Sequence, residues 1–436
     1  MIAEDGPVAW RQWTVLALVL CALVIDGIDT QLLALVAPLI MGEWGVDKAS
    51  FGPAMSAALL GMALGAGSGG WLGDRLGRRT VLIGATLSFG LCTVAVGLIH
   101  SLLPLVALRL IAGLGFGAVA PNGAALVSEW LPTGMRPRAM AFLSITIPMG
   151  GLIGGGAVLL LLPLVGWRGC FFTCGIATLV MVAVIVALLP ESAAYLAAKG
   201  RHAEAEDLVA RISRRPATAR AAAPIAASAV FTRANRRLNI GGWLAFFCLQ
   251  LIAYAFISWA PVLLTMLGWP LPHAIRGSLV FNLSAVCASL AAGWLLGWIR
   301  VRTLALIGSL GAIPALALLY ALFVAHGPFD AADEWIMLGA IALVSILAGW
   351  GIATIYTLLS FGYPAGCRAG GMGFGLMAGR AGGITSAFTG GALLAIDGAH
   401  PLAFFVPLMI AAAVAGLAVI LLGPRYAGRL VDMARP

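Results

Sequence analysis

The stretch from Leu23 to Ile40 constrains this chain most strongly, because it is an apolar run of membrane length with two carboxylates in its middle. A charged side chain near the centre of a bilayer costs at least about 2.5 to 3.5 kcal/mol on insertion scales. Asp26 and Asp29 are three residues apart and therefore share one face of a helix. We expect that face to look into a watery cavity or at a partner charge, not at lipid.

The composition is that of a membrane protein. The chain is 61% hydrophobic and only 10% charged, with a mean hydropathy of +1.03, whereas a soluble surface needs far more charge. A membrane span needs about 20 apolar residues, and the hydropathy pattern predicts about twelve of them. They are 13–41, 52–72, 79–99, 103–130, 139–163, 169–189, 239–267, 276–298, 303–325, 335–360, 369–396 and 402–423.

One long polar stretch divides these spans into two blocks of six. We predict an all-α integral membrane protein with an N-terminal six-helix bundle over 1–189, a cytoplasmic linker over 190–237 and a C-terminal six-helix bundle over 238–436. A shift of 223 residues aligns GWLGDRLGRRTV (70–81) with GWLLGWIRVRTL (293–304), which indicates an internal repeat. In this alignment Asp74 is matched by Gly297, so the second loop lacks the carboxylate.

The basic residues predict the orientation. Of the 26 lysines and arginines, 21 fall on the side that carries the N-terminus and the linker. This bias predicts that both termini and the linker are cytoplasmic. The formal charge of +9 is then a signal of topology, and we expect no nucleic-acid partner. The first span is too long for the core of a signal peptide, so we expect it in the mature protein.

The loop at 70–81 is the most specific motif. Its glycines permit a sharp turn, and its carboxylate stands beside arginines. Glu129, at the end of the fourth span, is expected to reach the same arginines. We interpret one set of residues as a cytoplasmic gate: Asp74, Arg75, Arg78, Arg79 and Glu129.

Two arginines fall inside predicted spans. Arg109 lies roughly 10 Å deep and Arg380 near mid-membrane by helical rise. Because Asp29 has a similar depth to Arg109, we predict a pair between the first and fourth spans. The pair Gly61 and Gly65 has the spacing that lets membrane helices pack closely.

No enzyme or metal site is predicted. The seven cysteines fall in or at the ends of spans, and neither His nor carboxylate neighbours Cys170 and Cys174. There is no H-E-x-x-H motif and no nucleophile with a partnered base. We therefore expect no catalytic activity and no cofactor.

GWLGDRLGRRTV resembles the loop signature of the major facilitator superfamily, and Arg109 with its spaced glycines resembles the fourth-helix pattern of the same superfamily. DGIDTQ in the first span, SWAPVLL (258–264) and YPAGCRAGGMGFGLMAGRAGG (363–383) resemble its aromatic acid:proton symporter family. The resemblance implies the major facilitator fold and the import of benzoate, hydroxybenzoates, protocatechuate or related acids with protons across the bacterial inner membrane.

The chemistry of such a substrate suggests roles for particular residues. An aromatic carboxylate needs a cation and apolar or aromatic walls. The expected substrate-binding residues are Arg380, Gln250, Tyr254, Trp350 and Tyr356, although aromatic residues in spans also serve as packing or interface anchors. The expected proton-coupling residues are Asp26, Asp29 and Arg109, where protonation of either aspartate would loosen the pair. The expected partners are the substrate, protons and the lipid bilayer, and we expect a monomer.

Other functions remain open on the sequence alone. A related facilitator could carry a sugar acid or a dicarboxylate, or export drugs. Against export, the fifth span has Gly150, Gly151 and Gly154 but no Gly-Pro pair. A membrane-embedded enzyme or a sensor that does not transport is the alternative from a different class.

Overall fold

The computed structural model describes residues 9–132, 145–213, 230–325, 331–363, 367–396 and 401–422, together with 135, 139, 142 and 143. Within these residues every regular element is a helix, which confirms the all-α prediction. The chain forms two compact units. Unit 1 comprises Met1–Leu32 and Ala57–Ala223, and unit 2 comprises Leu33–Ser56 and Pro224–Pro436. The boundaries of the linker at 190 and 237 stay a prediction.

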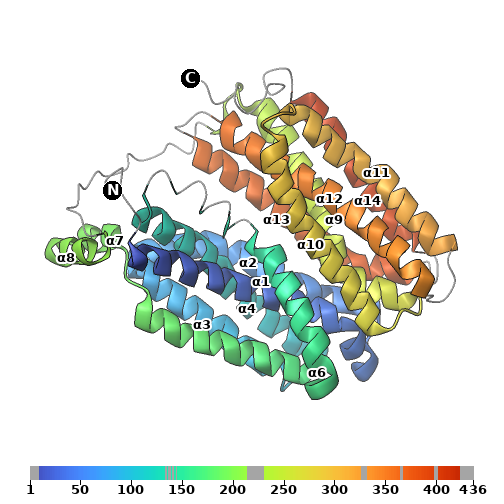
Figure 1. The fold of residues 1–436 in the computed structure, drawn as a ribbon, viewed down its shortest axis with the longest axis horizontal. Helices are drawn as coiled ribbons and strands as arrows, with labels where there is room; N and C mark the ends of the chain where they lie inside the picture. Colours follow the sequence, from blue (N-terminus) through green and yellow to red (C-terminus); the bar gives the residue numbers. More distant parts are fainter. Residues whose placement is uncertain are drawn as a thin grey trace. The chain divides into compact units, whose positions relative to one another are not determined.

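Unit 1 contains the first part of α1, most of α2 and the helices that follow as far as the linker (Figure 1). α3 packs against both α4 and α6. The bounds are α1 Trp10–Trp44, α2 Lys48–Leu76, α3 Arg78–Val96, α4 Leu102–Trp130, α6 Thr146–Leu188, α7 Ala193–Ala198 and α8 His202–Ser213.

α6 is two helices in succession. It runs for 43 residues, about 65 Å at 1.5 Å per residue and therefore twice the thickness of a bilayer core. Gly166 interrupts it with φ 66° and ψ 179°, a conformation that glycine adopts without steric cost. The predicted spans 139–163 and 169–189 meet at this break.

Unit 2 is built around α9, which packs against α13, α14, α10 and α12. Helix α11 packs against α12 and α14. The bounds are α9 Arg236–Met266, α10 Leu271–Leu295, α11 Val301–Ala325, α12 Ala331–Gly362, α13 Arg368–Ile396 and α14 Leu402–Leu421.

By length and hydropathy, ten of the described helices can cross a membrane. α13 is not among the ten, and its 29 residues include nine glycines and two arginines, which are less hydrophobic than the rest. With α6 counted twice and α13 added, the helices account for the twelve predicted spans.

Local chemistry explains where several helices begin. Asp47 caps α2 by accepting hydrogen bonds from the backbone N–H of Ser50 at 2.7 Å and from its hydroxyl at 3.0 Å. These bonds favour the charged carboxylate and lower the pKa of Asp47. α3 begins after Gly77, whose φ of 100° turns the chain directly out of α2.

Glycines bring α2 and α4 into backbone contact, as the Gly61/Gly65 spacing predicts. A Cβ added to Gly65 would lie 2.1 Å from the carbonyl oxygen of Leu114, and one added to Gly117 would lie 2.3 Å from that of Met62. Side chains larger than hydrogen are therefore excluded at this contact.

Candidate functional site

A buried ion pair joins α1 to α4 in unit 1. Arg109 Nη1 donates to Asp29 Oδ2 at 2.8 Å, and Arg109 Nη2 donates to the backbone carbonyl of Asp29 at 3.0 Å. Asp29 is 0% exposed and Arg109 1% exposed. The structure thus confirms the predicted contact between these two residues. Such a pair is costly to break, since one buried charge left alone costs about 3 to 5 kcal/mol.

A hydroxyl from α3 completes the surroundings of this carboxylate. Thr93 Oγ1 donates to Asp29 Oδ1 at 2.6 Å. The thiols of Cys92 and Cys174 lie near enough to interact electrostatically with both charges. Sequence reasoning missed Thr93, because a threonine in an apolar span usually bonds only to its own helix, and its spacing carries no signal of a partner on α1.

Asp26 lies one turn earlier on α1 and is also buried, at 2% exposure. Thr30 donates to its Oδ1 at 3.3 Å. Between the two aspartates, Gly27 lets α1 approach α6, since a Cβ there would lie 2.8 Å from the carbonyl oxygen of Ile147. The D-G-x-D pattern thus combines two buried carboxylates with a close helix contact.

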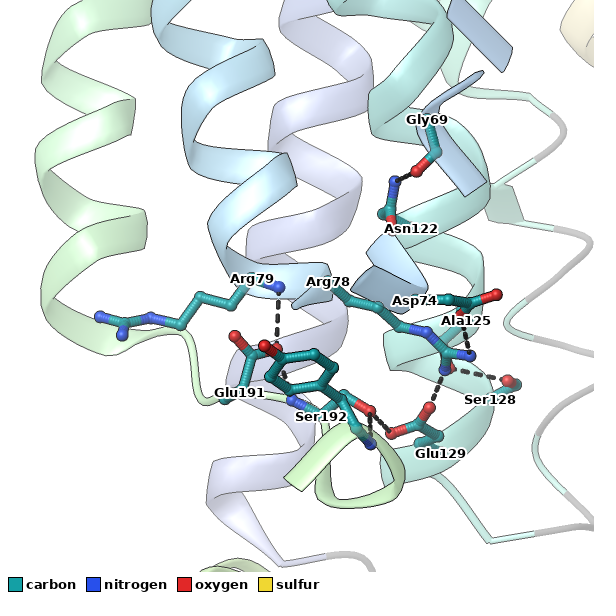
Figure 2. A network of polar contacts seen from close by, with 11 residues as sticks. Gly69, Asp74, Arg78, Arg79, Asn122, Ala125, Ser128, Glu129, Glu191 and Ser192 are labelled. Carbon is teal, nitrogen blue, oxygen red and sulfur yellow. Dashed lines mark hydrogen bonds and ion pairs between the residues drawn. The ribbon is translucent and has the colours of Figure 1, made fainter. Parts of the chain in front are cut away.

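A second polar cluster, here called the linker-side cluster, lies where α2, α3, α4 and α7 meet (Figure 2). Arg78 forms ion pairs with Glu129 and, at 3.5 Å, with Asp74. Glu129 in turn accepts a hydrogen bond from Ser192 Oγ at 2.6 Å. The structure therefore brings together the side chains of three of the five predicted gate residues. The cluster consists of Asp74, Arg78, Arg79 through its backbone N–H, Glu129, Glu191 and Ser192.

Glu191 and Ser192 attach α7 to this cluster. Glu191 accepts from the backbone N–H of Arg79 at 3.0 Å, and Ser192 caps α7 by accepting from the N–H of Tyr195 at 3.0 Å. Sequence reasoning assigned both residues to the linker, although a serine directly before a helical run is a capping signal.

The other two predicted gate residues point elsewhere. The guanidinium of Arg79 donates to the backbone carbonyl of Val186 at 2.6 Å, so only its backbone serves the cluster. Arg75 stacks over the ring of Trp71, 4.0 Å from its centroid, which is a cation–π contact.

In unit 2, Gln250 and Tyr254 lie one turn apart on α9, against α13. A Cβ on Gly379 would lie 3.0 Å from Gln250 Cγ, and one on Gly383 would lie 2.8 Å from the ring of Tyr254. Arg380 therefore stands on the helix turn that contacts these two residues. It is half-buried, and within the described part of the chain its guanidinium has no hydrogen-bond acceptor or ion-pair partner.

The two predicted residues on α12 differ. Trp350 is half-buried, and its indole Nε1 is buried without a partner among the described residues. Its neighbour Gly351 lies against α9, where a Cβ would be 2.9 Å from Leu249 Cδ2, so Trp350 stands level with Gln250. Tyr356 lies six residues further on and is 39% exposed. The described contacts thus bring Arg380, Gln250 and Tyr254 to the α9–α13 contact and the neighbour of Trp350 against α9.

A family model for the Major Facilitator Superfamily matches residues 19–387 of this chain. The chain belongs to the major facilitator superfamily. It is 31% identical to a 4-hydroxybenzoate transporter of Pseudomonas aeruginosa, over 96% of this chain and 94% of that protein. It is 30% identical to a gallate transporter of Pseudomonas putida, over 92% of this chain and 90% of that protein. These relatives confirm the resemblance to the superfamily's aromatic acid:proton symporter family.

Solved structures confirm the fold. The crystal structure of a D-xylose-proton symporter superposes on this protein with a TM-score of 0.75 at 17% identity, over 96% of this chain and 98% of the symporter. The chain is thus a multi-pass membrane protein of the major facilitator fold.

Proposed function

We propose that this protein imports an aromatic carboxylic acid together with protons across the bacterial inner membrane, by alternating access. The substrate class follows from its relatives, which are named as transporters of 4-hydroxybenzoate and gallate. Both acids combine a carboxylate with a hydroxylated ring. A site for them therefore needs one cation, aromatic or apolar walls and a few polar groups.

The observation that carries this proposal is that Arg380, inside a membrane helix, has no anionic partner among the described residues. A guanidinium in a membrane helix is costly unless it has a partner, and Arg380 has none among the described residues. A planar carboxylate fits the guanidinium fork with two parallel hydrogen bonds. Gln250 and Tyr254 lie on α9 against α13, and Trp350 is next to the glycine of α12 that packs against α9. The indole N–H of Trp350 has no partner among the described residues, so in this proposal it can donate to an oxygen on the substrate's ring. Tyr356 is a more remote candidate.

The proton carrier in this proposal is the Asp29–Arg109 pair, with Asp26 as the alternative carboxylate. When Asp29 binds a proton, its charge attraction to Arg109 is lost. The backbone carbonyl of Asp29 still accepts one hydrogen bond from the guanidinium, so Arg109 stays in place. Protonation thus weakens the α1–α4 contact without disassembling it, and in this proposal it permits substrate binding and the change of access.

The linker-side cluster serves as the cytoplasmic gate in this proposal, with both termini in the cytoplasm. Asp74 is exposed, so its pair with Arg78 contributes modestly, whereas the pair between Arg78 and Glu129 is more buried; in this proposal both open and close with the gate. Arg78 joins the ends of α2 and α4 through Asp74 and Glu129, and Glu129 in turn binds Ser192 at the start of α7, so these contacts form one connected network. We further propose that the protein acts as a monomer and catalyses no chemical reaction.

The decisive experiment is uptake of radiolabelled acids into proteoliposomes under an inward proton gradient. The panel contains benzoate, 4-hydroxybenzoate, protocatechuate and gallate, with a sugar acid and a dicarboxylate as controls. We expect accumulation of at least one aromatic acid, abolished by an uncoupler. Uptake of only a control acid would overturn the substrate class, and uptake that ignores the uncoupler would overturn proton coupling.

A pair of variants tests the carrier. Asp29→Asn is expected to abolish gradient-driven accumulation while retaining exchange of internal for external substrate, because exchange needs no net proton movement. Asp26→Asn is the matched variant one turn away. If both variants keep full accumulation, neither aspartate carries the proton.

A further inference from the structure

Thr93 stands in an unusual position for a membrane-helix threonine. Its hydroxyl lies 2.6 Å from Asp29 Oδ1 on α1 and 2.9 Å from the backbone carbonyl of Phe89 on its own helix. Both contacts are buried, and Thr93 itself is 1% exposed. A hydroxyl has one proton and two lone pairs. It can donate to only one of these two oxygens at a time.

The two acceptors match the two charge states of Asp29. When Asp29 is charged, the Thr93 hydroxyl donates to Oδ1 and Arg109 donates to Oδ2. When Oδ1 carries a proton, the carboxylic acid becomes a donor and needs an acceptor. Thr93 Oγ1 can accept that bond while its own proton turns to the carbonyl of Phe89. In both states the hydroxyl proton of Thr93, and the proton on Asp29 when it is present, each have an acceptor, so neither of these two donors is buried unpaired.

We propose that Thr93 is a positioning residue for proton coupling, whose hydroxyl reverses its hydrogen bond each time Asp29 gains or loses a proton. One proton enters and leaves at Oδ1, and Thr93 keeps its own proton throughout. This inference rests on the proposed function, in which Asp29 carries the coupled proton.

The other groups around Asp29 cannot both donate a hydrogen bond to the charged carboxylate and accept one from the protonated acid. Arg109 of α4 is a donor only and serves Oδ2 and the backbone carbonyl. The thiols of Cys92 on α3 and Cys174 on α6 are near enough to Asp29 and Arg109 to interact with their charges, but a thiol is a weak hydrogen-bond partner. Asp26, the nearer of the two other carboxylates on α1 along the sequence, accepts a hydrogen bond from Thr30. Among the described residues, Thr93 is the one that supplies a hydroxyl to Asp29.

The chain offers a matched control on the same helix. Thr86 is 0% exposed and donates to the backbone carbonyl of Leu82 at 2.8 Å, the same bond within the helix that Thr93 can make to Phe89. It differs from Thr93 in having no carboxylate contact in the described structure. Thr86→Val and Thr93→Val therefore make the same side-chain change in similarly buried positions of α3.

The first measurement is the pH profile of gradient-driven uptake for wild type, Thr93→Val, Thr93→Ser and Thr86→Val. Valine removes a hydrogen bond to the charged carboxylate, which is stronger than the bond lost by the neutral acid. The pH of half-maximal uptake is expected to rise by about one unit in Thr93→Val. It should stay near wild type in Thr93→Ser and Thr86→Val. An unshifted Thr93→Val, or an equal shift in Thr86→Val, would overturn the proposal.

A second measurement does not depend on transport. Infrared difference spectra between acid and alkaline pH detect the C=O band of a protonated carboxyl, and Asp29→Asn assigns that band. In Thr93→Val the band should move to higher frequency, because the acid has lost its acceptor, and its titration should shift to higher pH. A band that titrates in wild type but is unchanged in Thr93→Val would contradict the role of Thr93 and leave Asp29 as the proton carrier. If no band disappears in Asp29→Asn, Asp29 does not titrate and the proton carrier falls with it.

Discussion

Arg109 and Arg380 are both arginines inside membrane helices, and their surroundings give them different uses. Arg109 is 1% exposed and uses two of its nitrogens on Asp29. Arg380 is half-buried and has no acceptor in the described part of the chain. A cation that is already neutralised holds a structure together, whereas one that lacks a partner is ready to bind an anion.

Replacing Arg380 tests this use directly. Hydrogen bonds to charged groups are worth about 1.5 to 3 kcal/mol, so Arg380→Gln should raise the substrate concentration at half-maximal uptake roughly 10- to 150-fold. Arg380→Lys keeps the charge but loses the planar fork and should fall in between. The measurement is the concentration dependence of uptake, with Arg276→Gln, an exposed arginine of the same unit, as control. An unchanged half-saturation in Arg380→Gln contradicts the assignment.

Replacing one or both members of the Asp29–Arg109 pair separates stability from coupling. Arg109→Gln leaves a buried carboxylate without its cation and should destabilise the protein by about 3 to 5 kcal/mol. Asp29→Asn combined with Arg109→Gln removes both charges and should recover most of that loss. Thermal unfolding in detergent measures both effects. The double variant should still fail to accumulate substrate, and equal destabilisation of the single and double variants would argue against a coupled pair.

Sequence reasoning found the charged residues of the buried pair but not the hydroxyl beside it. Asp29 and Arg109 were recognisable because charge inside a span is expensive, and their similar depths predicted their contact. Thr93 was not recognisable, because a threonine satisfied by its own helix looks the same in the sequence as one that also faces a carboxylate. The contact depends on how α3 is rotated against α1, which only the fold determines.

At the scale of helices, small residues decide how closely elements approach. Gly65 and Gly117 place α2 and α4 in backbone contact, and the G-x-x-x-G spacing was enough to predict this. The break at Gly166 within α6 was not predicted as such. Hydropathy reports where apolar segments lie, but it does not report whether the turn between two of them is helical.

Two alanine substitutions on α2 measure the cost of filling this contact. A Cβ at Gly65 would lie 2.1 Å from the carbonyl oxygen of Leu114, whereas one at Gly67 meets nothing within 4 Å. Gly65→Ala should therefore destabilise the protein by about 1 to 3 kcal/mol. Gly67→Ala should be neutral or slightly stabilising, since alanine is the better helix former. Thermal unfolding of the two variants compares them, and similar melting temperatures would contradict the close contact.

Ser192 makes α7 depend on the linker-side cluster. Its hydroxyl both caps α7 and donates to Glu129, so Ser192→Ala removes two contacts at once. Loss of a cap costs about 1 kcal/mol, and hydrogen exchange in 193–198 should accelerate several-fold. Ser128→Ala is the control, because the hydrogen bond that Ser128 makes within the described residues is to the backbone of Ala125 on its own helix. Unchanged exchange in Ser192→Ala would mean that α7 is held by other contacts.

At the scale of the molecule, some side-chain interactions of unit 1 have an equivalent at the matching position of unit 2, and others do not. The 223-residue shift matches Arg79 with Arg302, and both guanidiniums donate to backbone carbonyls, of Val186 in α6 and Ile420 in α14. The carboxylate Asp74 is matched by Gly297. Elsewhere in unit 2, Tyr363 Oη donates a neutral hydrogen bond to Asn239 Oδ1 at 2.6 Å. The sequence alignment predicted this asymmetry of charge. It could not predict the neutral contact, which joins residues 124 positions apart.

The distribution of basic residues leads to a prediction for the whole molecule. Because the predicted topology assigns 21 of the 26 lysines and arginines to the linker side, we expect the linker to face the cytoplasm. A protease site inserted at Gly200, an exposed turn between α7 and α8, should be cut only in inside-out vesicles. The same site at Gly45, an exposed turn between α1 and α2, should be cut only in right-side-out vesicles. The reverse pattern would place the linker-side cluster on the outer face and require a different account of which gate it closes.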